Sequence, residues 1–90
     1  MKTFDLEVLN SVVDSVNVSA DIMYDTTSIY GFEEAISMEA KYQLYCRLSD
    51  VKDYLGISVE MVTTLVDRLY SINKDLFVSQ ALSSFEEAYA

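Results

Sequence analysis

The stretch that decides the fold runs from Leu48 to Tyr70 and reads LSDVKDYLGISVEMVTTLVDRLY. Its first half places Val51 and Leu55 on a helical stripe, and Gly56 follows where a helix end favours a left-handed residue. Ser58 can then cap a second helix by accepting a hydrogen bond from a free backbone N–H. That helix has an apolar stripe of its own, formed by Val62, Leu65, Val66 and Leu69. We therefore predict two helices joined by a tight turn, with the rest of the chain packed around them.

The apolar spacing predicts helices on both sides of this hairpin. Upstream, one long helix can run from Phe32 to Leu55, or it can break near Ser49, which would cap a separate helix from Asp50. The residues leave both possibilities open. Downstream, Asn73 and Lys74 form a short link before a last helix over about 75–89. The residues of that helix expected to face the core are Phe77, Val78, Ala81, Leu82, Phe85 and Tyr89.

The N-terminal part carries an apolar seam with steps of three and four residues, formed by Leu6, Leu9, Val13, Val16, Ala20 and Met23. This seam predicts a first helix from about Asp5 to Tyr24. Residues 16–24 also alternate in polarity as a strand does, but no second strand lies nearby to pair with them. Residues 25–30, DTTSIY, form the connection to the next helix, for which Gly31 is the expected N-cap.

Composition agrees with an all-α fold. Two glycines and no proline leave little material for turns between strands. We predict a single domain over residues 1–90, a compact bundle of four to five helices with a helix-turn-helix-like central hairpin. Its hydrophobic content of 51%, with seven tyrosines and four phenylalanines, is more than such a small core needs. We expect a second copy, as in a homodimer, or another partner to cover the surplus.

Charge is distributed unevenly along the chain. Eight acids and no base lie between Thr3 and Ala40, whereas five acids and five bases lie between Lys41 and Asp75. The net charge of −9 repels phosphate, so direct binding to nucleic acid or to an anionic membrane is not expected. A basic protein surface is the natural complement of this charge.

Few side chains suited to catalysis are present. The chain has no histidine and a single cysteine, Cys46, so it can form neither a Ser-His pair, nor a Cys-His pair, nor a zinc site. We expect Cys46 to be a buried, inert thiol in a reducing, cytoplasmic environment. Glu33 and Glu34 are expected to stabilise a helix N-terminus and not to act as a catalytic pair. The sequence therefore predicts no enzymatic activity, metal or cofactor.

The central stretch resembles the helix-turn-helix of DNA-binding regulators through Val51, Leu55, Gly56, Val62 and Leu65. The resemblance covers about a quarter of the chain and departs from the family at Lys52, where a small residue is usual. It implies a recognition helix with Ser58, Glu60, Thr63, Thr64 and Asp67 exposed, a set that contains no base for phosphate. We take it as a likeness of fold.

Our leading hypothesis is a non-enzymatic protein-interaction module that regulates or inhibits a larger partner with a basic surface. If that surface normally binds nucleic acid, the module would block it by competition. In size and charge the chain is similar to small acidic proteins of phages and plasmids. The residues expected to bind the partner are Glu7, Asp14, Asp21, Glu33, Glu34, Tyr24, Tyr30 and Tyr42. The alternatives are a DNA-binding regulator that uses Ser58, Thr63, Thr64 and Arg68, and an assembly subunit buried in a homo-oligomer.

Overall fold

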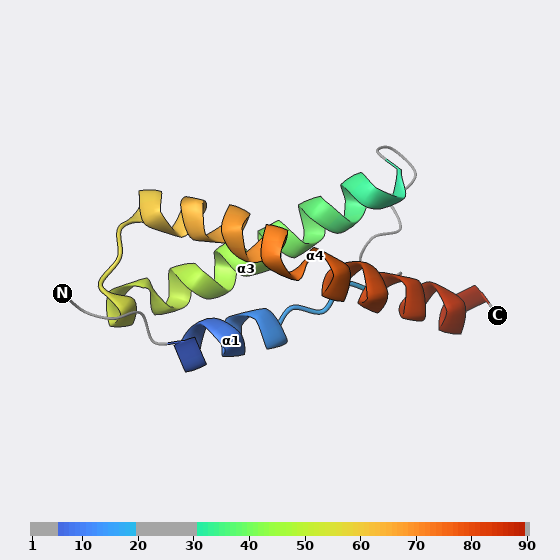
Figure 1. The fold of residues 1–90 in the computed structure, drawn as a ribbon, viewed down its shortest axis with the longest axis horizontal. Helices are drawn as coiled ribbons and strands as arrows, with labels where there is room; N and C mark the ends of the chain where they lie inside the picture. The colour runs from blue at the N-terminus through green and yellow to red at the C-terminus, as the bar shows by residue number, and fades with distance from the viewer. Residues whose placement is uncertain (1–5, 20–30, 90) are drawn as a thin grey trace.

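The computed structural model describes residues 6–19 and 31–89, with side chains up to residue 87. Within these ranges the chain forms three helices and no strand: α1 (Leu6–Asp14), α3 (Phe32–Leu55) and α4 (Val59–Tyr89). Figure 1 shows α3 and α4 as a long antiparallel hairpin, with α1 lying along the half of α3 next to the turn. The all-α class is confirmed. The expected four to five helices are not, since the described ranges contain three.

The turn between α3 and α4 forms as its residues predict. Gly56 adopts left-handed backbone angles, φ 69° and ψ 36°. Its N–H donates to the carbonyl of Asp53, and the N–H of Ile57 donates to that of Lys52 over 3.1 Å. These two bonds form a Schellman motif, which satisfies carbonyls that the end of α3 would leave unpaired. Ser58 caps the next helix, because its Oγ accepts a bond of 3.2 Å from the N–H of Met61.

Both helices of the hairpin continue past a position where the sequence allowed a break, Ser49 in α3 and Asn73 in α4. α3 runs through Ser49 without a break, and its buried face continues across that position, with Leu44 and Leu48 before it and Leu55 after it. In α4 the expected link at Asn73 is a kink inside one helix, with φ −108° and ψ 16°. The side-chain amide of Asn73 donates to the carbonyl of Leu69 over 2.9 Å, one turn earlier, and so holds the helix together across the kink.

The core lies along the line where α3 meets α4. Its largest fully buried side chains are Phe77, Ile36, Leu44, Leu48, Val16, Val18 and Val62. The rings of Tyr70 and Phe77 stack with centroids 6.0 Å apart. Near the start of α3, Phe32 meets Phe85 edge to face at 5.3 Å. Leu82, which was expected in the core, is 49% exposed.

The first helix is shorter than expected, because α1 ends at Asp14 and not near Tyr24. After it, Val16 and Val18 are buried while Asn17 between them is exposed, the alternation of a strand. Gln43 of α3 bonds both backbone groups of Asn17: its Oε1 accepts from the N–H over 2.8 Å, and its Nε2 donates to the carbonyl over 3.0 Å. A side-chain amide thus replaces the missing neighbouring strand. Residues 20–24 lie outside the described ranges.

Candidate functional site: two surfaces of α3

The described members of the expected binding set are all exposed. Glu7 and Asp14 lie on α1, Glu33 and Glu34 lie in the first turn of α3, and Tyr42 is 66% exposed in the middle of α3. The other three members of the set, Asp21, Tyr24 and Tyr30, lie outside the described residues.

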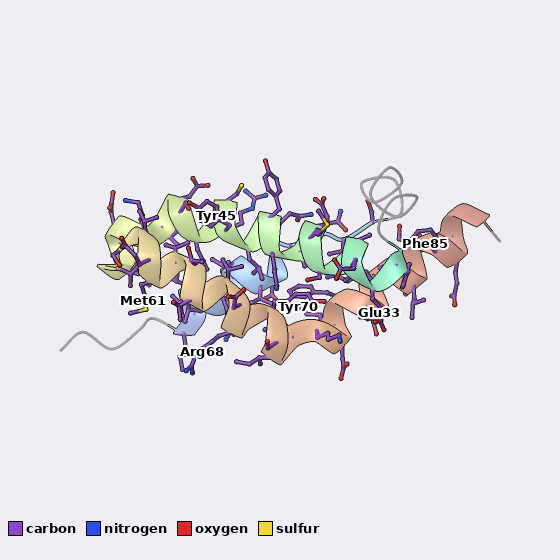
Figure 2. All side chains as sticks on the ribbon, turned by 90° about the horizontal axis from the view of Figure 1, so that it is seen from above. Glu33, Tyr45, Met61, Arg68, Tyr70 and Phe85 are labelled. Atoms are coloured by element: carbon purple, nitrogen blue, oxygen red, sulfur yellow. The ribbon has the colours of Figure 1, made fainter. Side chains whose placement is uncertain are left out.

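These residues do not form one patch. Glu7 borders a groove together with Asp50 and Tyr54, near the end of α3. Glu33 lies at the opposite end, where Figure 2 shows it near Phe85. At 1.5 Å of helix rise per residue, Glu33 and Asp50 are separated by roughly 25 Å along α3. The structure therefore separates the acids of α1 from those at the start of α3.

Glu34 and Tyr42 do share one face of α3, and two further residues complete it. Met38 and Tyr45 are 45% and 42% exposed, so four residues at positions i, i+4, i+8 and i+11 form an exposed strip. In Figure 2, Tyr45 lies on α3, whereas Tyr70 lies between α3 and α4. We call Glu34, Met38, Tyr42 and Tyr45 the tyrosine ridge. Met38 was missed in the sequence, although its helical spacing from Tyr42 and Tyr45 could have identified it.

A second surface is an open groove of about 630 Å³ between α1 and α3. We call it the α1/α3 groove. It is lined by Glu7, Val8, Ser11 and Val12 of α1, by Ser15 directly after that helix, and by Arg47, Asp50, Val51 and Tyr54 of α3. Ser11 in the middle of the α1 wall and Ser15 at its end leave space that longer side chains would fill. Its position on α3 is about half a turn away from that of the tyrosine ridge, at 100° of rotation per residue.

The negative charge is little neutralised within the described ranges. Every described carboxylate is exposed except that of Glu39, which is half-buried and accepts a bond of 3.0 Å from Gln43. Two ion pairs are formed there, Lys41 with Asp67 at 3.6 Å and Lys52 with Asp53 at 3.1 Å. The Nζ of Lys41 also lies 5.2 Å from the centre of the Tyr70 ring. No charged side chain among these residues is buried.

The arrangement of α3 and α4 differs from that of a DNA-binding helix-turn-helix, whose two helices cross at about 90–120°. Figure 1 shows α4 folding back along α3 instead. The hydroxyls of Thr63 and Thr64 donate within α4, to the carbonyls of Val59 and Glu60. Arg68 projects from the outer edge of α4 in Figure 2, and its neighbour Asp67 is acidic and exposed.

Cys46 is exposed, so the expectation of a buried thiol was wrong. The apolar residues near it in the sequence are Leu44 and Leu48, and each lies two residues away, about 200° around the helix. Both of those leucines face the core, and the thiol therefore points outward.

Within the described ranges, no three His, Cys, Asp or Glu side chains are grouped so that they could bind a metal ion. None of the helices there combines the length and the apolar character needed to cross a membrane. No family model, curated protein or solved structure matches this chain.

Proposed function

We propose that this chain is a small, acidic, non-enzymatic interaction module that docks on the basic surface of a larger cytoplasmic protein and regulates or inhibits it. The observation that carries the proposal is the tyrosine ridge, in which one exposed face of a helix presents two tyrosines and a methionine beside Glu34, on an acidic chain. If the partner's surface normally binds nucleic acid, this module blocks it by competition, as small phage proteins can.

The ridge has the composition of a binding site. Tyrosine and methionine are enriched in protein interfaces, where a tyrosine ring buries a large area while its hydroxyl finds a polar partner. Tyr42 is 66% exposed, so a partner could cover most of its ring. Glu34 lies at one end of the ridge and adds a carboxylate that a lysine or arginine of the partner can pair with.

Charge supports the choice of a basic partner. The net charge of −9 attracts a cationic surface over distances up to the Debye length, about 8 to 10 Å at physiological salt. Such attraction chiefly raises the rate of association, whereas buried aromatic anchors slow dissociation. The proposal therefore assigns steering to the carboxylates and affinity to the tyrosines.

The test is affinity capture from the source cells, followed by binding measurements with the purified partner. The immobilised chain is compared with Tyr42→Ala and with Ile72→Ala, a control on α4 that is 77% exposed. We expect Tyr42→Ala to weaken binding at least tenfold, Ile72→Ala to change it less than twofold, and salt to weaken all three. An affinity that does not depend on salt, or equal losses in both variants, would contradict the proposal.

Two further measurements test the alternatives. Ten large apolar side chains are exposed in the described ranges, which supports the expectation of a homodimer, and sedimentation velocity measures it directly. A gel shift with random duplex DNA at low salt tests the DNA-binding alternative. Retarded DNA would favour a regulator that uses Arg68, and we expect none.

A further inference from the structure

The α1/α3 groove has the shape of a binding site for another helix. Its walls are α1 and α3, which run in opposite directions in Figure 1, and the groove between them is open to solvent. Arg47 to Tyr54 spans about 10.5 Å and Glu7 to Ser15 about 12 Å, or two turns of helix. Helical bundles are built by laying a further helix between two such walls. A two-turn apolar strip on a partner helix matches this length.

The chemistry of the lining defines that helix. Val12 is buried and Val51 is half-buried, and together they supply an apolar floor. Ser11 and Ser15 are exposed and small, so they leave room above it. Glu7 and Asp50 are exposed carboxylates on the two walls, and together with Arg47 they give the lining one net negative charge. The groove therefore suits a helix that is apolar on one side and cationic on the other.

We propose that the α1/α3 groove binds a basic amphipathic helix of a partner protein, with leucine-like residues on Val12 and Val51 and lysine or arginine near Asp50. This inference goes beyond the proposed function, because the groove lies about half a turn around α3 from the tyrosine ridge. A negative result for the α1/α3 groove would therefore leave the proposal for the tyrosine ridge standing, and the reverse also holds. Arg47 lies on the same wall, three residues before Asp50, and disfavours a cation at its own position.

The probe is a synthetic helix of 14 residues, acetylated and amidated, with leucines on one face and lysines on the other. Its control is a peptide of the same composition in which the two residue types are mixed around the helix. Binding to the full chain is measured by calorimetry and mapped by NMR. We expect the amphipathic peptide to bind at least tenfold more tightly than the mixed one and to shift the resonances of Ser11, Ser15 and Val51.

Variants of the chain distinguish binding in the groove from general attraction of the cationic peptide by the net negative charge. Ser11→Phe fills the groove and should weaken binding at least tenfold, whereas Thr64→Phe, on an exposed site of α4, should change it less than twofold. Asp50→Asn should weaken binding two- to fivefold and Arg47→Gln should strengthen it. Asp75→Asn and Lys74→Gln make the same changes in net charge at exposed positions near the kink, and their effects should be smaller.

Several results would overturn the proposal. Equal binding of the two peptides, or equal effects of Ser11→Phe and Thr64→Phe, would mean that the chain attracts lysine without using the groove. Shifts confined to Tyr42 and Tyr45 would place the helix on the tyrosine ridge instead. A dimer that Ser11→Phe dissociates would show that a second copy occupies the groove. Tyr42→Ala should leave peptide binding unchanged, so this result is independent of the partner assay.

Discussion

The substitution Gln43→Ala tests how the segment after α1 is held. Gln43 bonds both backbone groups of Asn17, at 2.8 and 3.0 Å, and its Nε2 also donates to Glu39. Alanine removes all three bonds while leaving α3 with a good helix former. The change therefore isolates the contact that takes the place of a neighbouring strand.

The expected loss of stability follows from the exposure of Asn17. A hydrogen bond contributes about 0.5–1.5 kcal/mol to folding, and the lower half of this range applies where water can replace the lost partner. Asn17 is exposed, so its two bonds together contribute about 1–2 kcal/mol. The bond to Glu39 joins residues one turn apart and adds about 0.2–0.5 kcal/mol. In a domain of this size each kcal/mol lowers the melting temperature by about 4–8 °C.

Urea unfolding followed by circular dichroism measures the free energy, and amide hydrogen exchange locates the change. We expect Gln43→Ala to accelerate amide exchange at Asn17 through local opening. At Leu48, exchange should change only as much as the loss in the global free energy of unfolding requires. Glu39→Gln is the matched control, since it keeps an acceptor for Gln43 and should change stability by less than about 0.5 kcal/mol. A loss below about 0.3 kcal/mol in Gln43→Ala, or unchanged exchange at Asn17, would refute the reasoning.

The remaining predictions concern the core, the two glycines, the cap and the thiol. Phe77→Ala removes a fully buried ring and should lower the free energy of unfolding by about 3–5 kcal/mol in urea titrations. Gly31→Ala should destabilise more than Gly56→Ala in the same assay: neither new Cβ meets an atom within 4 Å, but Gly31 has φ 86° and ψ 171°, a region essentially restricted to glycine. Ser58→Ala removes the cap of α4 and should lower the free energy of unfolding, measured by calorimetry, by about 1 kcal/mol. Cys46 should react with a thiol reagent in the folded chain within a few fold of its rate in denaturant, and protection would contradict its exposure.

The hairpin could be predicted because its signals are local. Gly56 and Ser58 determine a helix end and a helix start through bonds to residues at most five positions away. The apolar spacing from Phe32 to Leu55 likewise determines which face of α3 is buried. Each signal lies within the element that it defines, so no knowledge of the rest of the fold was needed.

The segment after α1 could not be predicted in this way. The backbone N–H groups of Asn17 and Val18 donate to side chains that lie 26 and 62 residues further along the chain, at Gln43 and Gln80. The bond from the Val18 N–H to Gln80 is long, at 3.4 Å, but Val18 itself is fully buried. Periodicity indicated a strand and the absence of a second strand argued against it. Both glutamines of the chain resolve the conflict, and only the fold brings them there.

The acidic residues of the candidate site were predicted to act together because they are close in the sequence. In the fold, the antiparallel packing of α1 on α3 separates the acids of α1 from those at the start of α3. α1 lies along the half of α3 next to the turn, so Glu7 borders the same groove as Arg47 and Asp50 and lies far from Glu33. Charge that is segregated along the sequence is consequently spread along a molecule of 49 × 23 × 19 Å. The aromatic part behaves differently, because Tyr42 and Tyr45 lie on one helix and spacing alone fixes their common face.

This spread of charge bears on how a partner would be recognised. A field distributed over a rod of 49 Å attracts any cationic surface and distinguishes poorly among them. Specific recognition then requires contacts that depend on shape, and the described ranges offer two on α3: the protruding tyrosine ridge and the recessed α1/α3 groove. A ridge fits a concave partner and a groove fits a convex one. The charge therefore accounts for encounter with a basic protein, and the faces of α3 would decide which basic protein stays bound.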